Sequence, residues 1–340
     1  MKLVILLSCL VITSSFGAIS KKVNLYSIPK KDIDVNVAKK WFDHYYSAGQ
    51  DRFREAFKKG GLYKDSIELV LNRYNIPLDF YYLAMTESYF NNFAMSPKKA
   101  AGIWQFIPST AKAYGLVVND QIDERLHPIK STIAAAKYIK DLYNIFQDWT
   151  LAAAAYNCGE YRVLRAIKKA ESRSFAVLAK KKLLPNETIN YISKIWVTRE
   201  IDLKIRQAES PKERDKYLSL SPITIKKHGL SLDTFSLITE ISVDEILTFN
   251  PDLIKAKGIL PSDISIYLPT TKAMNYTNFI RFNGVISNLR YPGSLKKYGF
   301  DRSREGDKIK VTFVSKKKIN VKNIRTKEQV TLDKLNLPSI

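Results

Sequence analysis

Apolar residues recur at helical spacing from about residue 36 to residue 206. They return every three or four positions in the segments 41–46, 67–71 and 133–146. Glycine and proline residues separate these segments, and the alternation typical of strands is nearly absent from the sequence here. Two helix boundaries stand out: Asp148 is a good N-cap for the segment 149–156, and Gly115 ends the segment that Pro108 begins. The pattern predicts one all-α domain, which we place at 35–206.

The pattern changes after a charged stretch at 207–216. Residues 223–225 read as a short strand, and 232–241 as a helix. Ser242 and Glu245 have the capping-box spacing that opens a second helix, and 264–268 returns as a strand. This order predicts a small α+β module at 221–271.

Basic and apolar residues alternate in the tail, for example at 308–314. The alternation predicts a few strongly basic β-strands within 276–340. The tail suits electrostatic attachment to a cell wall or an outer membrane, and it equally suits a solvated sheet face.

The N-terminus has the layout of a secretory signal peptide, which we place at 1–18. Lys2 precedes an apolar run at 3–12, and small residues follow through Ala18. The run is too short for a permanent membrane span. Two other interpretations are a lipoprotein acylation site at Cys9 and a buried N-terminal helix, although Gly17 and the following lysines fit the helix poorly. We therefore expect an exported protein of the periplasm or cell envelope, anchored to a membrane if Cys9 is lipidated.

The net charge limits the classes of molecule that the protein is expected to bind. The chain has 55 Lys and Arg against 33 Asp and Glu, a formal net charge of +22. Such an excess favours polyanions: nucleic acid, an anionic membrane or a cell wall that carries carboxylates. A signal peptide argues against nucleic acid.

Cysteine and histidine usage predicts neither a disulfide nor a metal site. Cys158 would be the single cysteine left after removal of 1–18, so an intramolecular disulfide is excluded. His44, His127 and His228 lack the spacing of paired ligands, and no glycine-rich phosphate loop is present. We expect no metal and no cofactor.

One carboxylate lies on an apolar helix face. A helix that starts near Pro77 places Glu87 on the same face as Phe80, Leu83 and Ala84. Apolar surroundings and the nearby helix C-terminus both disfavour its charged form and raise its pKa, as a general acid requires. Taken alone, the position also fits an ordinary surface glutamate.

A series of motifs accompanies this glutamate in order. Glu87-Ser88 is followed by Ser96-Pro97, by the segment 101–108 (AGIWQFIP), by 154–159 (AAYNCG), and by 184–188 (LPNET) with Tyr191. The series resembles the soluble-lytic-transglycosylase domain, a goose-lysozyme-like fold, and is most similar to the membrane-bound lytic murein transglycosylase D group. The resemblance implies a lysozyme-like α-helical catalytic domain over 35–206.

The resemblance also implies roles for individual residues. Glu87 would be the catalytic acid/base, Ser96 and Gln105 would contact the sugar, Tyr156 and Asn157 would frame the cleft, and Tyr191 would approach from the opposite side. The sequence departs from the family at Glu160-Tyr161, where a Pro-Gly turn is usual, so the shape of that loop is left open. The module at 221–271 loosely resembles LysM, a glycan-binding domain, although Ser231-Leu232-Asp233-Thr234 replaces the usual Gly-Asp-Thr-Leu; a structural spacer fits equally well.

The resemblance implies a peptidoglycan lytic transglycosylase that cuts the MurNAc–GlcNAc β-1,4 bond without water and leaves a 1,6-anhydro ring. A single glutamate suffices, because the 6-hydroxyl of the substrate serves as the nucleophile. One alternative is a goose-type muramidase, a hydrolase with a second carboxylate, for which the candidates are Asp120, Asp123, Glu124 and Asp148. The other is a non-catalytic wall-binding protein, against which the intact motifs argue. The expected partner is the peptidoglycan glycan strand.

Overall fold

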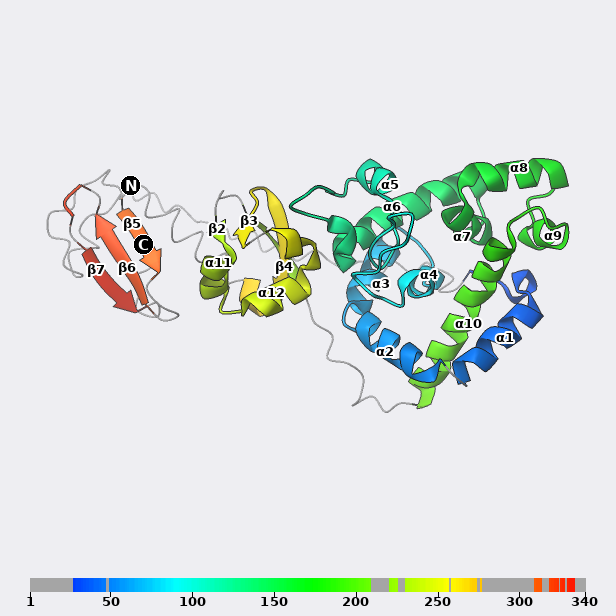
Figure 1. The fold of residues 1–340 in the computed structure, drawn as a ribbon, viewed down its shortest axis with the longest axis horizontal. Helices are drawn as coiled ribbons and strands as arrows, with labels where there is room; N and C mark the ends of the chain where they lie inside the picture. The colour runs from blue at the N-terminus through cyan, green and yellow to red at the C-terminus, as the bar shows by residue number, and fades with distance from the viewer. Residues whose placement is uncertain are drawn as a thin grey trace, which may run out of the picture.

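The computed structural model describes residues 27–46, 49–208, 220–225, 230–256, 258–273, 276, 309–313, 318–323, 325–327 and 329–333 (Figure 1). The predicted signal peptide, with Cys9, lies outside these residues. Within them, every helix falls short of the length and apolar character that crossing a bilayer requires.

The predicted mainly helical fold is confirmed. The helices of the first domain are α1 (Val35–Tyr46), α2 (Gln50–Gly61), α3 (Lys64–Arg73), α4 (Asp79–Ser88), α5 (Pro108–Ala113), α6 (Pro128–Phe146), α7 (Trp149–Cys158), α8 (Glu160–Ala170), α9 (Phe175–Lys180) and α10 (Asn186–Ala208), with short 3-10 helices η1 (Lys30–Asp32) and η2 (Glu124–Leu126). We call this the helical domain. The expected boundaries hold at α7, where Asp148 Oδ1 accepts a hydrogen bond from Leu151 N at 2.8 Å, and at α5, which starts at Pro108 and ends just before Gly115.

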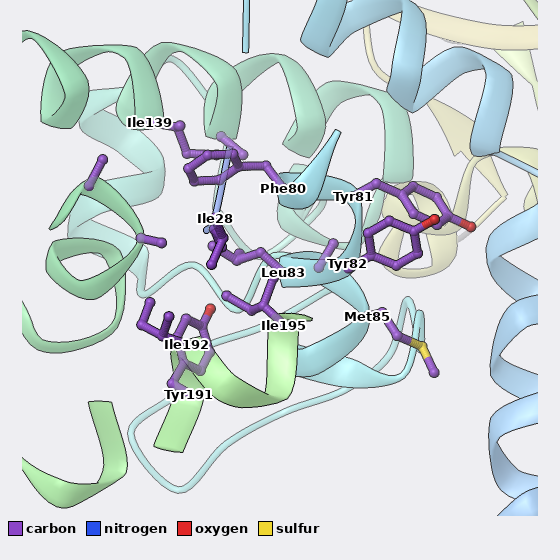
Figure 2. Close-up of a cluster of buried hydrophobic side chains, with 14 of the residues drawn as sticks. Ile28, Phe80, Tyr81, Tyr82, Leu83, Met85, Ile139, Tyr191, Ile192 and Ile195 are labelled. Carbon is purple, nitrogen blue, oxygen red and sulfur yellow. The ribbon is translucent and has the colours of Figure 1, made fainter. Parts of the chain in front are cut away.

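Helix α4 runs through the core of the helical domain. Phe80, Leu83 and Ala84 are at most 1% exposed. Helix α10 packs against α4, α1 and α7, and Figure 2 shows Leu83 in the same apolar cluster as Ile192 and Ile195 of α10. Burial of such side chains, each worth about 1.5–3 kcal/mol, fixes both helices.

The start of α4 differs slightly from the expected one. The helix begins at Asp79, two residues after Pro77. The buried Asp79 carboxylate accepts hydrogen bonds from the Ser27 and Ile28 amides. Arg199 Nη1 of α10 also donates to it, at 2.7 Å. The helix ends at Ser88, and the next residue, Tyr89, has a φ of 55°, in the left-handed region.

The α+β module (residues 220–276) has its own core. Its elements are β1 (Leu220–Ile225), β2 (Leu230–Ser231), α11 (Leu232–Thr239), α12 (Val243–Phe249), η3 (Pro251–Lys255), β3 (Ile259–Leu260) and β4 (Ile264–Pro269). Strand β1 pairs antiparallel with β4 and aligns Ile223 with Ile266, while β2 pairs with β3. Ser242 and Glu245 form the expected capping box. The two-residue strands β2 and β3 were not predicted, since so short a strand has no alternation to detect.

The described part of the tail is a three-stranded antiparallel sheet. Its strands are β5 (Ile309–Phe313), β6 (Lys318–Asn323) and β7 (Gln329–Asp333), in the order β5-β6-β7. Val311 aligns with Val321, and Val321 with Val330.

Candidate active site

Glu87 and Tyr191 meet between α4 and α10. Glu87 is the penultimate residue of α4, and Tyr191 lies in the second turn of α10. The Tyr191 hydroxyl donates a hydrogen bond to Glu87 Oε1 at 2.5 Å. Tyr191 is buried, whereas Glu87 keeps partial contact with solvent. The pair therefore places a carboxyl group with one fixed partner at the surface of the helical domain.

The surroundings of Glu87 set its pKa near neutrality. Burial against protein atoms raises this pKa from 4.5 to about 7. The hydrogen bond from Tyr191 opposes the rise because it favours the ionised carboxylate; the negative charge of Glu187 adds to the rise, and the positive charge of Lys194 opposes it. An acid with such a pKa can both give and take a proton at neutral pH.

Glu187 and Lys194 were not predicted as part of the site. Both lie on α10, at positions i−4 and i+3 from Tyr191, so they share its helix face. That spacing is the signal in the sequence that could have identified them. Burial lowers the pKa of Lys194, and the two nearby carboxylates counteract this effect.

Tyr156 lies close enough to Glu87 for the charge of Glu87 to affect the pKa of the Tyr156 hydroxyl. Burial, and then the charge of Glu87, raise the pKa of Tyr156 well above its ordinary value, so its hydroxyl stays protonated. That hydroxyl donates to the carbonyl of Trp104 at 2.7 Å. The ring lies against Tyr138 with a centroid distance of 5.3 Å, so Tyr156 also serves as a packing residue.

Ser96 and Gln105 lie in the loop between α4 and α5, and both brace it. Gln105 has a φ of 48°, and its Nε2 donates to the carbonyls of Gly102 (2.8 Å) and Ala94 (3.3 Å). Ser96 Oγ accepts a hydrogen bond from the Ala100 amide at 3.0 Å. These bonds hold the loop in shape, and the sugar contacts expected of Ser96 and Gln105 stay predictions.

A buried arginine clamps the same loop. Arg125 Nη1 donates to the carbonyls of Lys99 (2.6 Å) and Phe106 (3.0 Å). Asp123 holds the guanidinium with two hydrogen bonds of 2.8 and 2.7 Å. Gly102 packs so tightly here that a Cβ atom on it would lie 1.8 Å from the Arg125 carbonyl oxygen. Sequence reasoning missed Arg125, because the groups of the loop that it binds are carbonyls, which leave no mark in the side-chain pattern.

Three of the four candidates for a second carboxylate are engaged elsewhere. Asp123 pairs with Arg125, Glu124 accepts from the Val117 amide and pairs with Lys130, and Asp148 caps α7. Among the described residues, the carboxylate that acts on the pKa of Glu87 is instead Glu187.

Two further contacts hold the site together. Ser88 Oγ donates to the Ile103 carbonyl at 3.1 Å and so ties the loop to the end of α4. Asn157 Oδ1 accepts from Thr188 Oγ1 at 2.8 Å and so ties α7 to α10. In place of the usual Pro-Gly turn, Gly159 (φ 87°) leads directly into α8 at Glu160.

Comparison with known proteins shows what this domain is similar to. Residues 66–178 match the family described as Transglycosylase SLT domain. The predicted resemblance to a lytic transglycosylase is confirmed over these residues. The match is narrower than 35–206: it includes Glu87 and Tyr156, while Tyr191 lies beyond it.

Named relatives agree with the SLT match. The chain is 40% identical over 128 residues to membrane-bound lytic murein transglycosylase D of Escherichia coli K12. The aligned residues make up 37% of this chain and 28% of that protein. It is 41% identical over 100 residues to peptidoglycan transglycosylase gp16 of Escherichia phage T7, covering 28% of this chain and 8% of that protein. The chain thus spans less than a third of the length of either relative.

Among solved structures, the 70 kDa soluble lytic transglycosylase Slt70 of Escherichia coli aligns with a TM-score of 0.38 and 22% identity. The alignment covers 45% of this chain and 26% of Slt70.

Proposed function

We propose that this chain is an exported peptidoglycan lytic transglycosylase that cleaves the MurNAc–GlcNAc β-1,4 bond with Glu87 as its single acid/base. The observation that carries the proposal is the Glu87–Tyr191 pair: the carboxyl group of Glu87, with a pKa of about 7, lies within the residues that match the SLT family. Relatives named as murein and peptidoglycan transglycosylases support the substrate class.

The first step is protonation of the leaving group. Protonated Glu87 gives its proton to the glycosidic oxygen, the C1–O bond of the muramic residue breaks, and the GlcNAc unit departs with a free 4-hydroxyl. The positive charge that develops at C1 is stabilised by the neighbouring N-acetyl group. Burial favours this step because it keeps a large fraction of Glu87 protonated at neutral pH.

The second step closes the anhydro ring. Glu87, now a carboxylate, takes the proton of the muramic 6-hydroxyl as that oxygen bonds to C1. Tyr191 stabilises this charged state through its hydrogen bond to Oε1. Glu87 ends protonated, as it began, and no water is consumed.

Ordinary glycosidases need two carboxylates, one of which serves as the nucleophile or activates water. Here the substrate hydroxyl takes the place of the second carboxylate. The engagement of Asp123, Glu124 and Asp148 in other bonds supports this assignment.

The remaining assignments belong to the same proposal. Ser96 and Gln105 contact the bound sugar, and Tyr156 and Asn157 frame the cleft. The α+β module is LysM-like and contacts glycan, the basic tail attaches the protein to the envelope, and 1–18 directs export. Their support is the motif series, the strand–helix–helix–strand order and the charge of +22.

The test is the mass of the products released from purified peptidoglycan. A transglycosylase leaves anhydromuramic ends, which are lighter than the reducing ends of a hydrolase by one water molecule. We expect anhydro ends from the natural chain and a loss of activity of at least about 100-fold in Glu87→Gln. Reducing ends would assign the hydrolase alternative, and undiminished cleavage by Glu87→Gln would remove Glu87 from the mechanism.

A further inference from the structure

The α+β module is fixed to the helical domain by buried charges. Lys130 of α6 pairs with Asp252 of η3 (Nζ–Oδ2, 2.6 Å) and with Glu124 of η2 (3.0 Å), and Lys130 and Asp252 are both buried. The Asp123 amide also donates to the Asp252 carbonyl at 3.4 Å. Because breaking a buried pair costs about 3–5 kcal/mol, these contacts set one orientation of the module.

Apolar and aromatic contacts complete this boundary. Ile122, from the helical domain, belongs to the apolar core of the module. The rings of His127 and Tyr267 lie 4.7 Å apart, and the Tyr63 hydroxyl donates to the Thr248 carbonyl at 3.3 Å. The two units therefore share a packed interface, and whatever lies along it is built from both.

A hollow of about 530 Å³ lies along this interface. One wall is the loop 90–93, which continues directly from the helix of Glu87 toward Ser96, and the other is formed by α12 and η3. We call it the interface hollow. Its volume falls in the range of about 300–1,000 Å³ typical of small-ligand sites.

The walls of the interface hollow combine apolar surface with amide groups. Leu62, Phe93 and Ile254 line it and are 45%, 54% and 57% exposed. Beside Phe93 lie Asn91, whose Oδ1 accepts from the Phe93 amide at 3.0 Å, and Asn92, whose buried Oδ1 has no hydrogen-bond partner within the described residues. Exposed apolar side chains that gather on one surface mark a binding site, and the exposed Asn91 supplies an amide group beside them.

The chemistry of these walls suits an uncharged sugar. Pyranose rings have apolar C–H faces that pack on aromatic and aliphatic side chains, and an acetamido group offers an N–H donor to an amide oxygen. One lysine and one aspartate, Lys59 and Asp244, also line the hollow. Their opposite charges leave these walls without a net charge that would select a charged group, so the hollow fits an uncharged hexosamine unit of the strand.

We propose that the interface hollow is a second contact site for the glycan strand, separate from the cleft at Glu87, and holds an N-acetylated hexosamine unit of an uncut strand. The choice of ligand rests on the proposed function. A strand long enough to reach both sites binds more tightly than a short one, since the second contact is made within a complex already formed.

The experiment measures binding of peptide-free glycan strands prepared from purified peptidoglycan, with Glu87→Gln as the background so that strands stay intact. Ile254→Asp places a charge in the interface hollow. Ile259→Asp is the matched control, because Ile259 is equally exposed at 57%, lies in the same module and does not line the hollow. We expect Ile254→Asp to weaken binding of long strands about tenfold and to leave binding of a tetrasaccharide unchanged, while Ile259→Asp changes neither.

Phe93→Ser tests the opposite wall, and we expect it to weaken binding of long strands in the same way. Unchanged affinity in both Ile254→Asp and Phe93→Ser would overturn the proposal, as would an equal loss in Ile259→Asp or a failure of long strands to bind. The product assay on the natural chain distinguishes a failure of the proposed function from a failure of the proposed second site. Binding that depends on Ile254, without cleavage, would overturn the proposed reaction alone, and cleavage with binding indifferent to Ile254 would overturn the hollow alone.

Discussion

Tyr191 donates its hydroxyl to Glu87 Oε1 at 2.5 Å, across 104 residues of sequence. The bond joins the end of α4 to the second turn of α10 and opposes the effect of burial on the pKa of Glu87. Tyr191 is therefore a positioning residue that also tunes the acid.

Replacing Tyr191 by Phe should shift the pH profile of cleavage. Without the hydrogen bond to the charged form, the pKa of Glu87 rises above about 7. The alkaline limb, where the acid loses its proton, should move to higher pH, and the rate at the optimum should fall about tenfold because the carboxyl is less well oriented. The rate of glycan cleavage measured as a function of pH tests this prediction. Tyr161→Phe is the control, because the Tyr161 side chain is exposed. An alkaline limb at its original pH would contradict the assigned role.

The raised pKa of Glu87 also predicts how stability depends on pH. Between pH 4.5 and about 7 the folded chain holds a proton that the unfolded chain releases, so the free energy of unfolding falls as pH rises through this window. The amide side chain of Glu87→Gln does not titrate, so the variant should not show this fall in the free energy of unfolding. Above pH 7 the fall in the natural chain amounts to about 2–3 kcal/mol. Urea unfolding of both proteins at pH 4.5 and pH 8 gives the difference. A gap between them that stays constant with pH would contradict the raised pKa.

Gly102→Ala should destabilise the loop that carries Ser96 and Gln105. The added Cβ would lie 1.8 Å from the Arg125 carbonyl oxygen, and φ at Gly102 is +79°. We expect a loss of about 2–4 kcal/mol in the free energy of unfolding, together with weaker cleavage. Gly115→Ala is the control, because Gly115 also has a positive φ (+88°) but open space around its Cβ position. Equal losses in the two variants would assign the effect to backbone strain alone.

Lys130→Met should loosen the module from the helical domain. It leaves Asp252 and Glu124 without their shared cation, at a cost of about 3–5 kcal/mol. Calorimetry should show a lower melting temperature and a separate transition for the module. The exposed Lys137 of the same helix provides the control, Lys137→Met, which should melt like the natural chain. Unchanged melting in Lys130→Met would show that the interface does not depend on this pair.

Local patterns were enough to predict a helical domain and several of its helices. Helical spacing of apolar residues, the Asp148 cap and the Ser242–Glu245 capping box each involve residues only a few positions apart. Glu87 also stood out locally, as an acidic residue on an apolar face, but the ordered motifs and the resemblance they carry were needed to assign it as the acid.

Contacts between distant segments could not be predicted from those patterns. The sequence shows that Lys130 and Asp252 are charged, but not that they meet across 122 residues. The Arg125 clamp binds carbonyl groups, and every residue has one. The resemblance placed Tyr191 near the site, whereas Glu187 and Lys194 emerged only when α10 was seen beside α4.

The span between Glu87 and Tyr191 also sets the order in which the active site can appear as the chain is made. The ribosome adds the carboxyl group 104 residues before its hydroxyl donor. A nascent chain that ends at the last residue of α7 holds Glu87, Ser96, Gln105 and Tyr156, yet it lacks the helix that covers α4 and completes the acid. Competence to cut glycan should therefore arise in one late step, when α10 closes on the domain, and truncated chains that stop short of α10 should be inert toward the wall.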